Sequence, residues 1–254
     1  MKYNKVLGID IGGSGIKGAP VNTKDGLMLE PRYRIPTPDP SAPEDVANAV
    51  KKVVRYFKWD GPVGCGFPAA IQNGIARTAA NIDKSWIGTD VNKLFSEKTG
   101  LPVTVVNDAD AAGLAEMKFG AGKGHKGTVL LFTIGTGIGT VLFTSGRLVP
   151  NLEMGHIEMK GKDAELFISD VTRKHERLTW EEWALRFNDY LIAMEKLIWP
   201  DLIILGGGGS KKGEEFMKYL NVGAPVVLAR LLNDAGLIGA AIAAKYMHKI
   251  GADK

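Results

Sequence analysis

The chain of 254 residues predicts an α/β protein made of two related domains with a cleft between them. Its length exceeds the roughly 100–200 residues of one typical domain. Its two halves also share a pattern, since residues 6–15 and 129–138 each form an apolar run that enters a glycine-rich turn. Asp10 and Thr133 occupy the same place in these two segments, about half the chain apart. Chance similarity between two glycine-rich strands is the alternative to such a duplication.

Strands and helices alternate through the first half of the chain. We expect strands at 6–11, 16–21, 27–35, 62–71 (running into a Gly-Pro turn) and 103–106. Ser41 and Glu44 form a capping-box pattern before a helix whose valines fall on one face. A second helix at 89–100 can end at Gly100, and a third follows Asp108 and ends at Gly120.

The second half repeats this alternation. Residues 127–149 predict a strand, a glycine turn, a second strand and a second turn. Thr179 and Glu182 form another capping box, which begins a helix that stops at Pro200, and a buried strand then runs into four glycines. We expect a smaller N-terminal domain at 1–110 and a larger C-terminal domain at 111–234. The last helix, 235–250, should return to the N-terminal domain because its Gly-Ala face suits close packing.

The first glycine turn fits the spacing G-x-G-x-x-G over residues 13–18, which is found in dinucleotide-binding folds. That reading needs a helix after the glycines, but Gly18 and Pro20 make 16–21 poor helix material. Asp25-Gly26 is a hairpin signal instead, so the glycines lie between two strands. A tight glycine turn can still hold phosphate through backbone N–H groups. A plain glycine hairpin is the alternative.

Composition limits the classes of function. Hydrophobic residues make up 45% and charged residues 24% of the chain, which is typical of a globular protein. A net charge of +4 does not indicate a nucleic-acid partner, although a local basic groove could suit a polyanion. Cys65 is the single cysteine and points to a reducing compartment. The start of the sequence shows no signal-peptide pattern and no apolar run reaches membrane-spanning length, so we expect a cytoplasmic protein without a membrane partner.

Seven segments, taken in order, resemble the sugar kinases of the repressor–open-reading-frame–kinase (ROK) family. They are DIGGSGIKGA (10–19), GFPA (66–69), AANIDKSWIGTD (79–90), NDADAAGLAE (107–116), TIGTGIGT (133–140), PNLEMGHIEMKGKDAE (150–165) and LGGGGSK (205–211). Each glycine motif alone is weakly specific, but the ordered set covers nearly the whole chain. The resemblance implies an actin/hexokinase-like (ribonuclease H-like) fold, and within the family it is strongest to the polyphosphate glucokinases.

Asp108 is the candidate catalytic base. It follows a strand and opens a helix, so local sequence alone allows either an N-cap or a base that projects from the end of a sheet. The resemblance favours the base, which would take the proton of the 6-hydroxyl of glucose. It also implies six residues that contact glucose: Asn81, Asn107, Asp108, Glu153, His156 and Glu165. Glu158 is a weaker candidate for the role of Glu165.

The phosphoryl donor needs two phosphate loops and a nucleotide-side loop. The resemblance implies these residues for them: Gly12, Gly13, Ser14, Gly15, Lys17, Thr133, Gly135, Thr136, Gly137, Gly206, Gly207, Gly208 and Gly209. Asp10 would hold Mg²⁺, through water because Mg²⁺ keeps several of its waters. Basic clusters that could guide a polyphosphate chain are found at 51–55, 118, 123–126 and 211–212. Each of these clusters taken alone is better explained by a solvated surface.

One departure from the family concerns zinc. Typical members carry a cysteine cluster after the Gly-His motif and bind structural zinc with that histidine, but no cysteine follows His156 here. Since zinc needs about four nitrogen or sulfur ligands, we expect no zinc. The resemblance further implies a homodimer acting on glucose with polyphosphate, ATP or both. The alternatives are an ATP-dependent ROK hexokinase for glucose or mannose, and a non-catalytic sugar-sensing or assembly protein.

Overall fold

The computed structural model describes residues 4–80 and 82–252, with side chains described as far as Tyr246. Contacts divide the chain into two compact units, Met1–Ala115 with Asp234–Lys254, and Glu116–Asn233. The domain bounds expected from the sequence, 1–110 together with the helix 235–250, and 111–234, stay a prediction. No helix in the described part of the chain is both long enough and apolar enough to cross a membrane.

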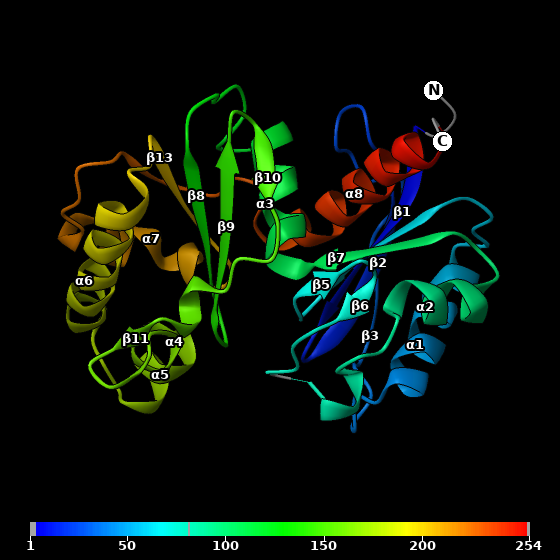
Figure 1. Ribbon diagram of the computed structural model, residues 1–254, viewed down its shortest axis with the longest axis horizontal. Coiled ribbons are helices and arrows are strands. Elements are labelled where there is room, and N and C mark those ends of the chain that lie inside the picture. Colours follow the sequence, from blue (N-terminus) through cyan, green and yellow to red (C-terminus); the bar gives the residue numbers. More distant parts are fainter. Residues whose placement is uncertain (1–3, 81, 253–254) are drawn as a thin grey trace. The chain divides into compact units, whose positions relative to one another are not determined.

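The first unit is built on a five-stranded sheet with the order β3-β2-β1-β4-β7 (Figure 1). β2 pairs antiparallel with β1 and β3, whereas β1, β4 and β7 run parallel. The strands are β1 (Lys5–Gly12), β2 (Gly15–Asn22), β3 (Tyr33–Ile35), β4 (Val63–Phe67) and β7 (Val103–Asn107), with a small hairpin of β5 (Ile71–Gln72) and β6 (Ile75–Ala76) beside them.

The second unit repeats this arrangement. Its five-stranded sheet has the order β10-β9-β8-β13-β14, with an antiparallel hairpin first and parallel strands after it. The strands are β8 (Val129–Ile134), β9 (Ile138–Thr144), β10 (Arg147–Val149), β13 (Leu202–Gly206) and β14 (Val226–Leu228), with a separate hairpin of β11 (Glu158–Met159) and β12 (Lys162–Asp163). Equal strand order and direction in the two sheets confirm the predicted fold class.

The helices of the first unit cover its sheet. They are α1 (Pro43–Tyr56), the short η1 (Lys84–Trp86), α2 (Val91–Thr99), the start of α3 (Asp108–Phe119) and α8 (Ala235–Ala252), preceded by η5 (Leu232–Asp234). Figure 1 shows α8 lying along β1. Gly64 on β4 makes this close packing possible, because a Cβ atom there would collide with the carbonyl oxygen of Ala240 on α8.

The second unit has one long helix and several short ones. They are η2 (Met154–His156), α4 (Glu165–Ile168), α5 (Asp170–His175), α6 (Trp180–Ile198), η3 (Gly209–Lys212), α7 (Gly213–Phe216) and η4 (Met217–Tyr219). α6 begins with the predicted capping box, in which Thr179 and Glu182 bond each other's backbone N–H groups.

Two local predictions for the first unit are wrong. The N-cap of α1 is Ala42, with no side-chain bond and Pro43 in the first turn, so Ser41 and Glu44 make no capping box. Proline suits that first turn because the backbone donor it lacks would have no partner within the helix. The strand predicted at 27–35 is reduced to Tyr33–Ile35, since Pro31 cannot donate to a sheet.

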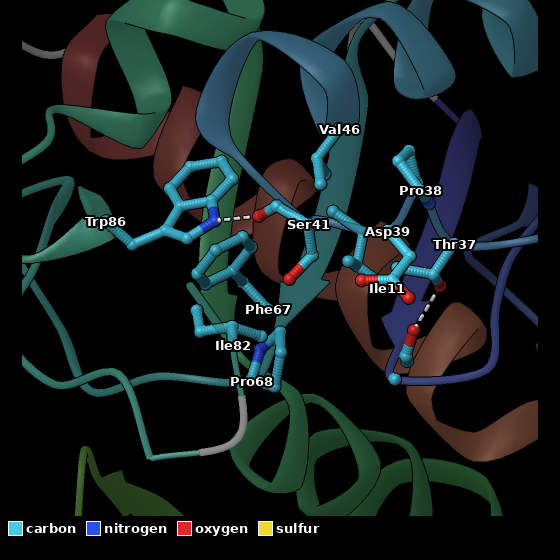
Figure 2. A pocket seen from close by; sticks show the side chains of 12 residues that line it. Ile11, Thr37, Pro38, Asp39, Ser41, Val46, Phe67, Pro68, Ile82 and Trp86 are labelled. Atoms are coloured by element: carbon cyan, nitrogen blue, oxygen red, sulfur yellow. Dashed lines mark hydrogen bonds between the residues drawn. The ribbon is translucent and has the colours of Figure 1, made fainter. Parts of the chain in front are cut away.

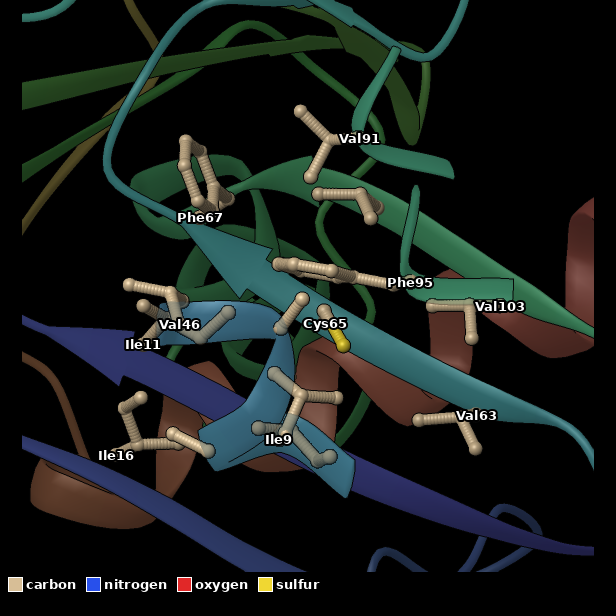
Figure 3. Close-up of a cluster of buried hydrophobic side chains, with 14 of the residues drawn as sticks. Ile9, Ile11, Ile16, Val46, Val63, Cys65, Phe67, Val91, Phe95 and Val103 are labelled. Carbon is tan, nitrogen blue, oxygen red and sulfur yellow. The ribbon is translucent and has the colours of Figure 1, made fainter. Parts of the chain in front are cut away.

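Each unit has its own hydrophobic core. In the first unit, aliphatic side chains of β1, β4 and α1 surround Cys65, which is fully buried and whose pKa is raised by that burial (Figure 3). In the second unit, the aromatic rings of Phe132, Trp183, Phe187 and Tyr190 pack between the sheet and α6. These cores fix the strand ends from which the polar residues project.

Candidate active site

Three parallel strands of the first unit bring polar residues to one edge of their sheet. β1, β4 and β7 lie side by side, with Asp10 opposite Gly66 and Phe67 opposite Asn107. A Cβ atom placed on Gly66 would lie 3.6 Å from the Cα of Asp108 and 3.9 Å from Oδ1 of Asp10. The two aspartates therefore flank a single position of bare backbone, which brings the predicted base next to the predicted metal ligand.

The carboxylate of Asp10 faces a lysine on one side and a glycine on the other. Lys17 lies directly across the β1–β2 hairpin, and its Nζ is 3.3 Å from Oδ2 of Asp10. Burial raises the pKa of Asp10, and the charge of Lys17 acts in the opposite direction. A Cβ atom on Gly236, near the start of α8, would lie 3.1 Å from Oδ1. The Oδ1 side of the carboxylate is thus bordered by backbone without a side chain.

The start of α3 separates the roles of Asn107 and Asp108. Oδ1 of Asn107 accepts the backbone N–H of Asp110 at 3.0 Å, which is the bond of an N-cap residue. Nδ2 of Asn107 donates to the carbonyl oxygen of Ala69 at 3.2 Å, so both ends of this amide are bonded. Asp108 is the first helical residue, and its Oδ1 accepts the N–H of Ala109 at 2.8 Å. The cap predicted as the alternative role of Asp108 is thus made by Asn107.

The first glycine turn closes the β1–β2 hairpin at Gly12 and Gly15. Gly13 and Ser14 at its tip are exposed, and a Cβ atom on Gly13 would meet nothing within 4 Å. The guanidinium group of Arg34 lies over Gly15, and its Nη2 donates to the carbonyl oxygen of Ser14 at 2.7 Å. An open turn with a cation beside it has the properties of an anion-binding loop.

A cavity of about 330 Å³ opens beside this turn (Figure 2). Figure 2 shows Phe67 and Trp86 on one wall and the side chains of Thr37 and Asp39 on the other. The Thr37 hydroxyl donates to the carbonyl oxygen of Gly12, and this bond attaches the loop that follows β3 to the first glycine turn. Apolar walls with a few polar groups are the usual lining of a small-molecule site.

The second glycine turn lies in the other unit and connects β8 with β9. Its backbone closes with the N–H of Gly135 donating to the carbonyl oxygen of Gly137 at 3.0 Å. Oε2 of Glu165 accepts the N–H of Ile138 at 3.2 Å and occupies the space that a side chain on Gly137 would need. The predicted sugar ligand Glu165 is therefore in direct contact with the second predicted phosphate loop. Thr136 is exposed at the tip of that turn.

Three carboxylates surround His156 in the same unit. Nδ1 of His156 lies 2.9 Å from Oδ2 of Asp163 and 3.9 Å from Oε1 of Glu165, and its Nε2 lies 3.8 Å from Oε2 of Glu153. The bond to Asp163 raises the pKa of His156, and the other carboxylates add to this effect. Burial raises the pKa of Glu153, while the charge of His156 opposes the rise. The cluster offers acceptors and one imidazole, a combination that can bond several hydroxyl groups.

The four-glycine segment follows β13 in the second unit. Gly206 lies opposite Thr133, at the strand end before the second glycine turn. Gly207 has a φ of 79°, and a Cβ atom there would lie 2.5 Å from the carbonyl oxygen of Ile134. Gly208 has no neighbour within 4 Å of such a position, so this part of the segment is open. Gly209 packs on the side chain of Ile134.

The sequence motifs named most of the polar residues described above, but three of these residues were not predicted. Asn107 and Asp108 lie in the first unit, Glu153, His156 and Glu165 lie in the second, and Asn81 falls outside the described residues. The missed residues are Arg34, Asp163 and the buried Thr140, whose Oγ1 donates to the Leu152 carbonyl oxygen and accepts the Met154 N–H. A predicted pairing of 16–18 with 33–35 could have indicated Arg34, because Lys17 and Arg34 are cross-strand partners.

The predicted basic residues at 123, 126, 211 and 212 are all exposed in the second unit. Among the side chains that the structure describes, at 4–80 and 82–246, no group of three or more histidine, cysteine or carboxylate side chains is placed to hold a metal ion. The absence of zinc stays a prediction.

Comparisons with known proteins agree with the resemblance. The model of the ROK family matches residues 6–176. A polyphosphate glucokinase of Mycobacterium tuberculosis is 46% identical over 238 residues, which cover 93% of this chain and 90% of that protein. The crystal structure of an inorganic polyphosphate/ATP-glucomannokinase from Arthrobacter sp. strain KM has a TM-score of 0.93 at 47% identity, covering 97% of this chain and all of the other. A ROK glucokinase of Streptomyces griseus, in complex with glucose and AMPPNP, has a TM-score of 0.82 at 25% identity, covering 95% and 99%.

Proposed function

Because the chain belongs to the ROK family, we propose that it is a polyphosphate-dependent glucokinase that phosphorylates the 6-hydroxyl of glucose. The observation that carries the proposal is the 46% identity, over 93% of the chain, to polyphosphate glucokinases. The geometry of each unit supports it, because each carries an open glycine turn next to residues that suit phosphate or sugar. A sugar sensor would not need a carboxylate at the position of Asp108.

Asp108 is the proposed general base. It lies at the N-terminus of α3, where the helix dipole favours a carboxylate by roughly 0.3–1 kcal/mol. A weak base is adequate because phosphoryl transfer passes through a loose transition state, in which the proton can leave late. Asn107 carries the helix cap, so the carboxylate of Asp108 is not needed for that bond.

The sugar ligands are proposed to be Asn81, Asn107, Asp108, Glu153, His156 and Glu165. A site with paired acceptors and donors rejects sugars that lack a hydroxyl group, because its own polar groups would then be left without partners. The cavity beside the first glycine turn adds an aromatic wall next to Asn107, since Phe67 is the cross-strand partner of that residue. We propose that the two compact units are the two domains of the enzyme.

Phosphate is proposed to bind at the two glycine turns. The first turn has the charges of Lys17 and Arg34 beside it, and the second has the exposed tip at Thr136. The open backbone at Gly208 suits the approach of a nucleotide when ATP is the donor. Exposed lysines at 123, 126, 211 and 212 are proposed to follow a polyphosphate chain.

Mg²⁺ is the proposed cofactor, and Asp10 is the residue that would hold it. A single carboxylate with one oxygen bordered by glycine backbone fits an ion that prefers oxygen ligands and keeps its waters. When bound, the ion would neutralise charge on the phosphates. Metal analysis of the purified protein should show no stoichiometric zinc, and a full zinc equivalent would refute the zinc-free prediction.

We propose ATP as a second phosphoryl donor and mannose as a second sugar acceptor. The structural similarity to a polyphosphate/ATP-glucomannokinase favours testing both, and the S. griseus glucokinase was crystallised with AMPPNP. A cytoplasmic location and a homodimer are also part of the proposal.

Coupled assays of glucose 6-phosphate formation, with polyphosphate and ATP side by side, test this function. We expect activity with polyphosphate. Activity with ATP but not with polyphosphate would favour the ATP-dependent hexokinase. Asp108→Asn should lower kcat by roughly 10²–10⁴-fold while glucose binding persists, because the amide keeps the shape but cannot take the proton. More than about a tenth of the wild-type kcat would exclude Asp108 as the base.

A further inference from the structure

Asp163 was not among the residues that the sequence indicates, yet it makes the shortest polar contact of His156. Its Oδ2 lies 2.9 Å from Nδ1 of the imidazole, well within hydrogen-bond range. An ionised carboxylate only accepts hydrogen bonds, so Nδ1 must carry a proton. The other ring nitrogen, Nε2, then faces the carboxylate of Glu153 at 3.8 Å.

The position of Asp163 is fixed by the fold around it. β11 and β12 pair Glu158 with Asp163, and the turn between the two strands has positive φ at Lys160 (52°) and Gly161 (79°). Positive φ at both central residues is typical of a tight type I′ hairpin. The next residue, Ala164, is fully buried and donates its N–H to the carbonyl oxygen of Ile157 at 2.9 Å.

Contacts outside the hairpin hold it in place. The ammonium groups of Lys160 and Lys162 lie 4.7 and 5.4 Å from the centroid of the Phe167 ring on α4. Met159 packs against the core of the second unit. These contacts hold the β11–β12 hairpin, and with it the backbone of Asp163, in place, although the side chain of Asp163 is half exposed.

We propose that Asp163 is a positioning residue, which fixes the tautomer and orientation of His156 so that Nε2 is presented to a hydroxyl group of the sugar. The proposal rests on the proposed function, in which His156 contacts glucose. The histidine keeps its ring orientation through a carboxylate on the far nitrogen, an arrangement that also orients histidines bound to metals. Glu153 and Glu165 are the other charged groups that face the ring, and they come from different segments.

Nuclear magnetic resonance of the full-length protein tests the pairing without any need for activity. Long-range ¹⁵N–¹H spectra report the tautomer and the pKa of each of the four histidines, and His156→Gln assigns the signals. In Asp163→Asn we expect the pKa of His156 to fall and its preference for a proton on Nδ1 to be lost. Glu181→Gln removes the same charge from an exposed position on α6 and should leave the His156 signals as they are in the wild type.

Kinetics then test the effect on the sugar. Asp163→Asn should raise the KM for glucose by roughly three- to tenfold, the range that one hydrogen bond is worth, with kcat and the KM for polyphosphate little changed. Asp163→Glu should restore part of the loss, and Glu181→Gln should leave the KM for glucose unchanged. Unchanged His156 signals in Asp163→Asn would overturn the proposal, as would altered signals with an unchanged glucose KM. A wild-type protein that does not phosphorylate glucose would instead refute the proposed function, while the spectra would still report the pairing.

Discussion

Glu116 on α3 is expected to contribute strongly to the stability of the second unit. Its side chain is 1% exposed, and its carboxylate accepts three backbone N–H groups. Oε1 accepts that of Leu231 at 2.7 Å, and Oε2 accepts those of Ala121 at 2.8 Å and Arg230 at 3.1 Å. The carboxylate therefore joins the end of α3 to the loop that follows β14.

The variant Glu116→Gln keeps the shape but replaces one acceptor oxygen by an NH₂ donor. One of the three N–H groups would then face another donor, and the other two bonds would lose the help of a full charge. A hydrogen bond to a charged group is worth about 1.5–3 kcal/mol. Since the loop at 230–231 is partly exposed and water can replace part of the loss, we expect the free energy of unfolding to fall by about 2 kcal/mol. In a chain of this length, that corresponds to a decrease in Tm of roughly 4–8 °C.

Urea unfolding followed by tryptophan fluorescence measures the change, because Trp180 and Trp183 report on the second unit. Glu215→Gln is the matched control, since Glu215 is exposed and its loss should stay within about 0.5 kcal/mol of the wild type. A loss below about 0.5 kcal/mol for Glu116→Gln, equal to that of the control, would show that these three bonds do not stabilise the unit.

Three further outcomes are expected. Tyr190→Phe should raise the free energy of unfolding by up to about 1 kcal/mol, because the buried Oη has no hydrogen-bond partner among the described residues. If urea unfolding instead shows that the free energy of unfolding falls by that amount, the hydroxyl group has a partner such as a buried water. The pKa of His156 is raised in the folded protein, so the extra stability from the charge of its ring beside Asp163 should be complete below about pH 6.5 and lost as pH rises through the folded value. The difference in unfolding free energy between wild type and Asp163→Asn, measured from pH 5 to 9, should therefore shrink with pH, and a growing difference would contradict the pairing. Replacing Lys211 and Lys212 by alanine should weaken the salt dependence of the KM for polyphosphate more than that for ATP; equal changes for both donors would argue against a polyphosphate track there.

Local chemistry was sufficient to predict the features that depend on neighbouring residues. The capping box of Thr179 and Glu182 and the left-handed C-cap at Gly100 both form as expected, because their bonds lie within one turn of chain. The pattern at Ser41 is wrong for a local reason as well, since Pro43 starts the helix one residue later. Ser41 contributes its carbonyl oxygen to the indole of Trp86 instead, a contact 45 positions away that no local pattern shows.

The candidate site was predictable as residue types and far less as contacts. Asp108, Glu153 and His156 were singled out by the motifs that surround them. The contact of Glu165 with the second glycine turn depends on how α4 packs beside that turn, and it was not predicted. Asp163 depends on the register of a two-residue hairpin whose turn sequence, Lys-Gly, is not among the strong hairpin signals. Tertiary packing decides both contacts.

The shared strand order of the two sheets has a consequence for how such a molecule can diverge. Asp10 and Thr133 lie at the same step of the first strand of each sheet, next to Gly66 and Gly206 on the parallel neighbour. The residue across the hairpin differs, since Asp10 faces Lys17 whereas Thr133 faces Gly139. One copy of the motif therefore carries a fixed pair of opposite charges, and the other carries none. A duplicated scaffold of this kind allows one half to change its electrostatics while the other half preserves an uncharged backbone turn.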